Sequence, residues 1–304
     1  MSGEYPKRAI RIMEELEKAG LPYDFAYNDQ ISISLNKSEL QIKVNGKDVR
    51  EYTHIIFGGH HLHSQRDYEI KRLIVDVVDE HNQDSGNSEP IRVQNSRFIK
   101  RMTFYSKLHM AKICADYGLP FLATYYDRSG KYQQSNLPFP YPLIAKHVDG
   151  RNDLVMIDGE KKVKKNVYKL DNENGWKQDR LATKSPALFF IQEFADSGED
   201  FRYFVSKGEV IGGWKRVAGD SFMTVNRKEG ARYFYANEPD KKIRDICKAA
   251  ADGWGVDFMA LDFMYKDGEP HILEFSMNPG FDAYEKKCED GEPTNIAEAI
   301  VKSF

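Results

Sequence analysis

The segment ALDFMYKDGEPHILEF, residues 260–275, predicts two strands joined by a tight turn at Lys266-Asp267-Gly268-Glu269. Asp262 lies on the first strand and Glu274 on the second, close to opposite each other. Two facing carboxylates in apolar surroundings are unfavourable unless a cation or another partner joins them. Mg²⁺ prefers oxygen ligands and is commonly held by one or two carboxylates together with substrate phosphates. The pair therefore indicates a magnesium site, and two solvated carboxylates on an edge hairpin are the ordinary alternative.

A lysine at the end of an apolar strand is a second candidate for chemistry. Lys146 ends the run Pro142–Lys146, and the loop His147–Asp153 follows it. A lysine that projects from a strand beside a loop is a common way to hold a phosphate. The ordinary alternative is an exposed strand lysine, and this residue alone does not separate the two.

Other charged residues follow in a fixed order along the chain. Lys107 stands in the middle of a predicted helix, and Glu193 ends a predicted strand. Asp200 and Arg202 are two residues apart, so they share one face of the next strand. Each residue has an ordinary explanation as a surface charge or ion pair. Only their order and spacing, taken together, indicate a functional site.

The first third of the chain predicts a small domain of its own. At 304 residues the chain suits about two compact lobes. Its first part alternates helix and strand, which is typical of a small α/β layer structure. The segments are a helix at 6–19, strands at Ile31–Leu35, Leu40–Val44 and His54–Phe57, a helix at Asp67–Asn82, a turn-rich loop at 83–90 and a strand at 91–93. We therefore expect an α/β domain over residues 1–95.

A second domain is expected from residue 96 to residue 304. A long helix from Ser96 to Tyr117 ends before Gly118, with Pro120 close behind. Strands then follow at Pro142–His147, Asp153–Ile157, Leu188–Phe194, Arg202–Val205, Val210–Trp214, Ala260–Tyr265 and His271–Phe275, with a helix at Asp240–Trp254. We expect two lobes, about 96–194 and 195–304, and an α/β fold of the α+β kind.

The composition excludes several classes of function. Hydrophobic residues make up 41% and charged residues 30% of the chain, as in a water-soluble globular protein. A net charge of -3 provides no general attraction to nucleic acid. No apolar stretch approaches the ~18 to 20 residues that span a membrane, and the amphipathic N-terminal helix is not a signal peptide. With three scattered cysteines, at 114, 247 and 288, we expect a cytoplasmic protein with reduced thiols.

Taken together, these segments resemble the ATP-grasp superfamily, and within it the RimK-like ligases that add amino acids to peptide or protein carboxylates. The resemblance runs from about Asn95 to Gly280, and the ordered series of motifs is more specific than any one of them. The matching motifs are Ser106-Lys107 with Gly118 and Pro120, Pro142 to Lys146, Gln192-Glu193-Phe194, Asp200-Phe201-Arg202, Lys215-Arg216-Val217-Ala218, Asn226 with Gly230, Ala260-Leu261-Asp262, and Leu273-Glu274 with Pro279-Gly280. The resemblance implies an ATP-grasp fold, with an N-terminal pre-ATP-grasp lobe and two lobes that clamp ATP.

The resemblance also implies an activity and a set of site residues. With ATP and Mg²⁺, or Mn²⁺ in its place, the family activates a small-molecule or peptide carboxylate as an acyl phosphate, and an amine then displaces the phosphate. Arg202 and Arg216 would face the transferred phosphoryl group, where fixed positive charge is most useful. The remaining residues would be Lys107 and Lys146 at the phosphates, Gln192, Glu193 and Phe194 at the adenine, Asp200 near the ribose, Asn226 near the phosphates, and Asp262 with Glu274 at the magnesium ion.

Three positions depart from the family pattern. The loop after Lys146 reads Gly150-Arg151-Asn152-Asp153, where relatives usually carry several glycines. Thr224 stands where relatives often have arginine. Ser276 replaces the asparagine that is expected two residues after the magnesium glutamate.

The metal's third ligand must therefore come from another residue. If the strand continues, Glu274, Ser276 and Asn278 share one face. A neutral hydroxyl is a poorer magnesium ligand than an amide carbonyl, and Pro279-Gly280 could bend the chain back toward the ion. We expect Asn278 to contribute more than Ser276.

The cluster Gly58-Gly59-His60-His61-Leu62-His63 leaves three roles open. His60, His61 and His63 could bind a metal, line the substrate cleft or be solvated.

The leading hypothesis is an ATP-dependent carboxylate–amine ligase. One alternative is an ATP-binding sensor or scaffold that does not ligate, because the departures at Thr224 and Ser276 have removed turnover. Another is an ATP-grasp kinase that phosphorylates a small molecule. We expect neither nucleic acid nor membrane as a partner, and the oligomeric state, including a homo-oligomer, stays open.

Overall fold

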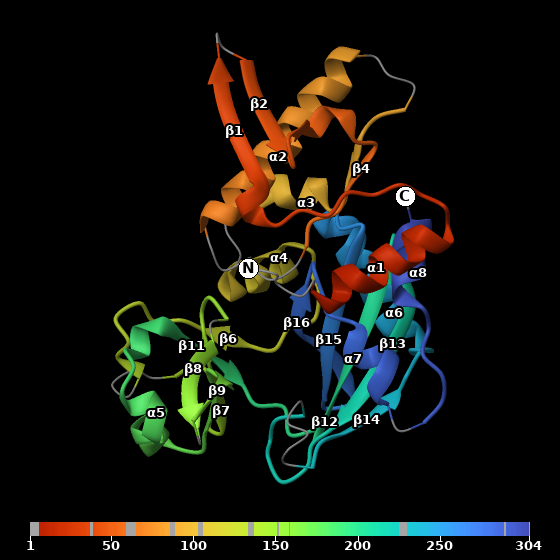
Figure 1. Ribbon diagram of the computed structural model, residues 1–304. Helices are drawn as coiled ribbons and strands as arrows, with labels where there is room; N and C mark the ends of the chain where they lie inside the picture. The colour runs from red at the N-terminus through yellow and green to blue at the C-terminus, as the bar shows by residue number, and fades with distance from the viewer. Residues whose placement is uncertain are drawn as a thin grey trace.

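The computed structural model describes residues 6–36, 39–58, 65–85, 89–102, 106–132, 137–150, 152–157, 159–224, 230–288 and 290–303. Within these ranges, helices and sheets form an N-terminal part, a small lobe and a large sheet with helices on both faces (Figure 1). The mixed α/β class predicted from the sequence is confirmed. Among the described residues, no helix combines the length and the apolar character that crossing a membrane requires.

The large sheet is antiparallel and comes from the C-terminal half of the chain. Its strand order among the described residues is β14-β13-β12-β15-β16. The bounds are Glu199–Ser206 for β12, Glu209–Val217 for β13, Arg232–Tyr235 for β14, Phe258–Lys266 for β15 and Glu269–Ser276 for β16.

One face of the large sheet packs against helices and forms the largest apolar core. Tyr203, Leu261 and Phe275 point from the strands into this core and meet Trp254 of α6. The helices on this face are α3 (Ser96–Arg101), α4 (Lys107–Asp116) and α6 (Lys241–Trp254). Phe98, Met110 and Leu119 therefore share a core with the large sheet, although the sequence groups them with residues 141–194.

The other face of the sheet is covered by helices only in part. Phe204 and Ala260 pack there with Tyr284, Ile300 and Ile12. These residues belong to α7 (Asp282–Lys287), α8 (Ile296–Lys302) and α1 (Lys7–Lys18), which lie together over the sheet in Figure 1. The N-terminal helix thus adds to the core of the C-terminal sheet.

The hairpin between β15 and β16 has the turn and the facing carboxylates that the sequence predicts. Asp267 and Gly268 have φ angles of 52° and 79°, and this two-residue turn with positive φ favours Asp-Gly. The register shifts after Asp262, which is opposite Glu274. Without this β-bulge, Leu273 would face Asp262, so the bulge brings the two carboxylates together.

The small lobe is built around a second antiparallel sheet with the order β10-β7-β11-β6. Its core contains Leu143, Phe189 and Tyr132, and the Tyr132 ring stacks on Trp176 with centroids 5.0 Å apart. A separate hairpin, β8–β9, extends from this lobe. The bounds are Thr124–Tyr125 for β6, Leu143–His147 for β7, Asn152–Ile157 for β8, Glu160–Lys165 for β9, Val167–Leu170 for β10, Phe189–Glu193 for β11 and Asp179–Ala182 for α5.

The N-terminal part has its own small core. Ile42, Val75, Val78 and Val93 are buried together where a long helix packs against the strands. The elements are β1 (Ile31–Asn36), β2 (Glu39–Val44), β3 (Lys47–Asp48), β4 (His54–Ile55), α2 (Gln65–Ser85) and β5 (Arg92–Val93). β1, β2 and β3 form an antiparallel sheet, and β4 pairs with β5 in parallel.

The helix predicted from Ser96 to Tyr117 was wrong as a single element. It is divided into α3 and α4, and Met102 after α3 has an extended backbone. The residues that follow Met102 are Thr, Phe and Tyr, a β-branched residue and two aromatics with low helix propensity. The sequence analysis also missed β3, β6, β9, β10, β14, α5, α7 and α8.

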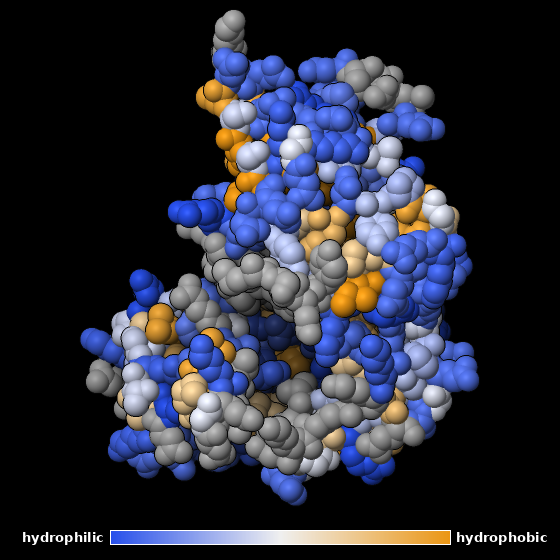
Figure 2. All heavy atoms as spheres, in the orientation of Figure 1, coloured by the Kyte–Doolittle hydropathy of each residue, from blue (hydrophilic) through white to orange (hydrophobic). Residues whose placement is uncertain are grey.

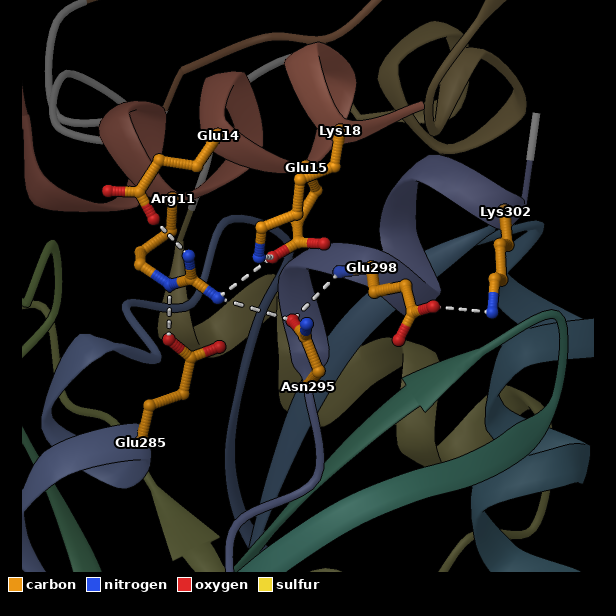
Figure 3. Close-up of polar contacts among 8 residues, drawn as sticks. All are labelled: Arg11, Glu14, Glu15, Lys18, Glu285, Asn295, Glu298 and Lys302. Atoms are coloured by element: carbon orange, nitrogen blue, oxygen red, sulfur yellow. Dashed lines mark hydrogen bonds and ion pairs between the residues drawn. The ribbon is translucent and has the colours of Figure 1, made fainter. Parts of the chain in front are cut away.

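An ionic network holds α1 against the C-terminal helices (Figure 3). Arg11 donates to Glu285 at 2.7 Å, to Glu15 at 3.2 Å and to Asn295 at 3.3 Å, and it also contacts Glu14. The Glu285 carboxylate has no other cation partner among the described residues. Because its side chain is 9% exposed, it depends on Arg11 for its charge balance.

We expect Arg11→Met to lower the free energy of unfolding by about 2 kcal/mol, because it leaves a mostly buried carboxylate unpaired. Lys302→Met is the matched control, since Lys302 forms an exposed pair with Glu298 that contributes about 0.5 kcal/mol or less. Urea unfolding of both variants measures the difference. Equal midpoints for the two variants would show that the network does not hold α1 in place.

Candidate functional site

The uncovered part of the large sheet carries a row of charged side chains across three strands. Arg202 on β12 is directly opposite Asp262 on β15, which is directly opposite Glu274 on β16. Arg202 donates to both oxygens of Asp262, from Nε at 2.6 Å and from Nη2 at 2.7 Å. This bidentate geometry is the most directional form of an arginine–carboxylate pair.

A second pair lies beside this row. Arg216 on β13 is opposite Asp200 on β12 and donates to its two oxygens at 2.5 and 2.8 Å. Arg216 also reaches Asp262 at 3.3 Å. The hydroxyl of Thr224 donates to Asp200 at 2.7 Å. Asp200 and Arg202 share a face as predicted, and the two arginines and two aspartates form one connected network.

The network sets the ionisation of Asp262 and Arg216, whereas burial raises the pKa of Asp200 above its ordinary value in spite of Arg216. Burial alone would raise the pKa of Asp262, but Arg202 and Arg216 outweigh burial and hold this pKa well below its usual range. Burial lowers the pKa of Arg216, and the charges of Asp200 and Asp262 raise it above its ordinary value. The two arginines therefore stay charged, and the carboxylates keep them in fixed positions.

Lys107 connects α4 with both lobes. It is the first residue of α4 and not the middle of a helix, as the sequence had suggested. Its backbone N–H donates to the carbonyl of Val148 after β7, and its ammonium pairs with Glu274 at 2.6 Å. Desolvation raises the pKa of Glu274, but the charge and hydrogen bond of Lys107 and the charge of Lys146 together outweigh it, so the pKa lies below its ordinary value.

Lys146 lies on the sheet of the small lobe and points toward the same charges. It donates to Gln192 Oε1 at 2.5 Å, and Gln192 also contacts Thr124. Burial lowers the pKa of Lys146 to about 7, and the nearby charge of Lys107 acts in the same direction. The carboxylates of Glu274 and Asp262 oppose this shift, so the two lobes are within electrostatic range of each other.

Figure 2 shows a hollow between the small lobe and the large sheet, with hydrophilic residues in its depth. Lys165, at the end of β9, is a cation that the sequence analysis missed. It interacts electrostatically with Glu274, Arg216, Arg202 and Asp262 across the hollow. Lys165 occurs in a lysine-rich strand, so no sequence signal distinguishes it from its neighbours.

The segment proposed to read adenine links β11 with the rest of the chain. The N–H of Glu193 donates to the carbonyl of Ala123, and its carboxylate pairs with Lys266 of the large sheet. The ring of Phe194 lies 4.5 Å from the ammonium of Lys169. Glu193 thus joins the small lobe to the large sheet.

The two facing carboxylates fit a magnesium ion that is completed by phosphate oxygens. Carboxylate oxygens are ligands that Mg²⁺ prefers, and here they pair with Arg202 and Lys107, so a bound Mg²⁺ would share these carboxylates with the two cations. Among the described residues, no group of three His, Cys, Asp or Glu side chains is placed to hold a metal without such additional ligands.

The expectation that Asn278 shares the face of Glu274 depends on the strand continuing, and β16 ends at Ser276. The amide oxygen of Asn278 instead accepts a hydrogen bond from Arg8 at 3.0 Å. Its role as a metal ligand stays a prediction. Asn226 and the three histidines His60, His61 and His63 lie outside the described residues.

Comparison with known proteins gives one curated relative and a set of similar folds. Coenzyme gamma-F420-2:alpha-L-glutamate ligase from Methanococcus maripaludis is 29% identical over 117 residues, which is 37% of this chain. The match spans 40% of the length of that relative.

Solved structures share the fold over almost the whole chain. The ATP-grasp ligase PsnB, in complex with a phosphomimetic variant of its minimal precursor, Mg and ADP, is 17% identical with a TM-score of 0.67. The comparison covers 99% of this chain and 95% of PsnB. An ATP-grasp ligase from Chryseobacterium gregarium, in complex with ADP and a leader and core peptide, is 17% identical with a TM-score of 0.61. It covers 97% of this chain and 90% of that protein. At these identities, the likeness establishes the ATP-grasp fold.

The family itself follows from the sequence of the C-terminal part. The model of the RimK-like ATP-grasp domain matches residues 111–304, which is well over half of the chain and includes both charge pairs of the large sheet. The chain therefore belongs to the RimK-like ATP-grasp domain family.

Proposed function

We propose that this protein uses ATP to join a carboxylate to an amine through an acyl phosphate. The observation that carries the proposal is the row Arg202–Asp262–Glu274 with the pair Arg216–Asp200 beside it. Fixed cations next to a carboxylate pair suit a phosphoryl transfer, because negative charge is redistributed in this reaction. The protein contributes mainly by positioning the substrates and stabilising that charge. Family membership and the ligase relatives support the same activity.

The reaction consists of two displacements. An oxygen of the substrate carboxylate attacks the γ-phosphorus of ATP, and ADP leaves. The amine nitrogen then attacks the acyl carbon, phosphate leaves, and the amine loses a proton to form the amide. Arg202 and Arg216 hold positive charge beside the transferred group, and Lys107, Lys146 and Lys165 bind the phosphates.

The carboxylates have a separate task. Asp262 and Glu274 would hold Mg²⁺, which neutralises phosphate charge when it is bound. Gln192 fixes the position of Lys146, and Asp200 with Thr224 fixes Arg216. We assign Thr224 this positioning role, since its hydroxyl takes one of the acceptor sites of Asp200.

The substrates are proposed by class. PsnB and the Chryseobacterium enzyme were solved with peptides, and the Methanococcus relative is named for glutamate. We propose an amino acid or a peptide as carboxylate donor and an amino acid or peptide amine as acceptor, in the cytoplasm. A kinase would stop after the first displacement, and a non-ligating sensor would bind ATP without either step.

The experiment is a screen followed by a product assay. Amino acids and short peptides are tested for thermal stabilisation with Mg²⁺ and a non-hydrolysable ATP analogue, because specific ligands stabilise by mass action. Pairs of hits are then tested for ADP release. ADP and amide that form only with both substrates support a ligase. A phosphorylated product with one substrate identifies a kinase, and binding without ADP identifies a sensor.

We expect Glu274→Gln to lower kcat by about 100-fold or more, because it removes one charge from the proposed metal site and the partner of Lys107. Glu269→Gln is the matched control on the same strand, since Glu269 forms an exposed pair with Lys242. The measurement is ADP formation against Mg²⁺ concentration. Full activity of Glu274→Gln at ordinary Mg²⁺ contradicts the metal assignment.

Binding of Mg-bound nucleotide should weaken as pH rises above about 7. The free protein holds the pKa of Lys146 at about 7, and phosphate charge raises it in the complex, so binding takes up a proton in this range. Below pH 7 the lysine is already charged and this contribution is complete. Titration calorimetry from pH 6.5 to 8.5 measures the slope.

Lys146→Arg is the control for this pH dependence, because its guanidinium stays charged throughout. The variant should bind nucleotide with a flatter profile. The same slope in both proteins shows that another group titrates.

A further inference from the structure

A cluster of charged and amide side chains lies in the small lobe, on the hairpin that carries Lys165. Asp153 is the second residue of β8, and Lys165 is the last residue of β9. In the antiparallel register of this hairpin, Asn152 is opposite Lys165 and Asp153 is opposite Lys164. The position of Lys165, a proposed phosphate contact, therefore depends on what holds the hairpin.

The carboxylate of Asp153 joins this hairpin to α5. Its Oδ2 atom accepts a hydrogen bond from Arg180 Nη2 at 2.7 Å and lies 2.8 Å from Lys184 Nζ. Its Oδ1 atom accepts from Asn166 Nδ2 at 2.9 Å and from Lys184 Nζ at 3.0 Å. Arg180 precedes Leu181, which is buried in the core of the small lobe, so the hairpin is tied to a packed helix. Lys184 and Arg180 hold the pKa of Asp153 well below its usual range, and the carboxylate stays ionised.

Asn166 connects the same carboxylate to the residue next to Lys165. It follows Lys165 directly in the chain and is buried. Its carbonyl accepts from the N–H of His147 at 3.2 Å, and its Oδ1 atom accepts from the hydroxyl of Tyr168 at 3.1 Å and from Arg180 at 3.2 Å. Because consecutive Cα atoms are only about 3.8 Å apart, a fixed Asn166 also restricts the position of Lys165.

Lys165 is the residue of this hairpin that reaches the charges of the large sheet. It interacts electrostatically with Glu274 and Arg216 across the hollow. Among the described residues, the hydrogen-bond and ion-pair partners of Asp153 all lie in the small lobe. By its charge alone, Asp153 disfavours the binding of phosphates. A favourable contribution from Asp153 therefore has to come from the position that it gives to another residue.

We propose that Asp153 is a positioning residue for nucleotide binding. Its contacts with Arg180, Lys184 and Asn166 hold the β8–β9 hairpin in place, so that Lys165 meets the phosphates of ATP. A hairpin that is held before ATP binds does not have to be ordered by the nucleotide, and the entropy cost of that ordering is not subtracted from the affinity. The inference rests on the proposed function for the phosphate role of Lys165.

The sign of the effect separates a positioning role from a direct effect of charge. By charge alone, Asp153→Ala would tighten the binding of a non-hydrolysable ATP analogue with Mg²⁺, and Arg180→Ala would weaken it. We expect both variants to raise the Kd by about 5-fold or more, because both release the hairpin. Titration calorimetry measures the Kd. Binding by Asp153→Ala that is unchanged or tighter overturns the proposal.

A double variant tests whether Asp153 acts through Lys165. Lys165→Met removes the proposed phosphate contact and should itself raise the Kd. Addition of Asp153→Ala should then change the Kd by no more than about twofold, because the same contribution cannot be lost twice. If the two losses add in full, Asp153 acts on nucleotide binding by another route, and the assignment to Lys165 is overturned.

Hydrogen exchange of the nucleotide-free protein tests the contacts themselves. Asp153→Ala should make the amides of β8 and β9 exchange about 10-fold faster or more, and leave the large sheet unchanged. Asp127→Ala is the matched control, since Asp127 also accepts from three donors in the small lobe, the N–H and hydroxyl of Ser129 and the N–H of Lys131. The control should alter neither this exchange nor the Kd. Asp153→Asn, which keeps the shape and loses the charge, replaces Asp153→Ala if the latter does not fold, and unchanged exchange overturns the proposal.

Turnover separates this inference from the proposed function. If the wild-type protein binds nucleotide but joins no substrate pair, the proposed function fails, whereas the Kd values and the exchange rates still test Asp153. If a pair is joined, Asp153→Ala should raise the KM for ATP by about 5-fold or more. A KM for ATP within about twofold of the wild-type value overturns the positioning role and leaves the ligase proposal in place.

Discussion

The mutual neutralisation of two arginines and two aspartates on one face of the large sheet is the constraint on which the rest of the structure depends. Arg216 and Asp200 are each 4% exposed in their side chains, so neither charge is stable there alone. Cross-strand register gives each arginine a carboxylate directly across or beside it. The helices cover the apolar part of this face and leave the charged part open to the hollow.

The same sheet also joins the N-terminal part to the site. Asn95, with a φ of 60°, donates from its side chain to the carbonyls of Phe258 and Met277 and accepts from the N–H of Phe258. These contacts hold the start of β15 and the end of β16 beside the N-terminal core. Because Ile12 of α1 packs with Ile300 of α8 as well, the N-terminal part contacts the C-terminal part at two places.

The positions of several candidate site residues could be predicted from the sequence because these residues lie on short strands with clear patterns. The alternation of Asp200 and Arg202 and the Asp-Gly turn at residue 267 are local signals, and the structure confirms both. The bulge at Leu273 has no such signal, although the facing of Asp262 and Glu274 depends on it. The turn alone would have given a register that pairs Asp262 with Leu273.

Other features depend on tertiary contacts between distant segments. Lys107 at the start of α4 donates its N–H to the carbonyl of Val148, a contact between distant segments that the sequence does not indicate. The ion pairs of Asp200 with Arg216 and of Glu193 with Lys266 could not be read from spacing. Arg8, Lys71 and Asn278 are separated by up to 270 residues, so only the fold brings them together.

The most direct measurement of the central claim follows the oxygen atoms of the substrate acid. A carboxylate labelled with ¹⁸O is converted in the presence of ATP, Mg²⁺ and its amine partner, and the inorganic phosphate is analysed by mass spectrometry. Attack of the carboxylate on ATP and displacement by the amine transfer one labelled oxygen to each phosphate released. Phosphate without label, formed together with the amide, would contradict an acyl-phosphate ligase.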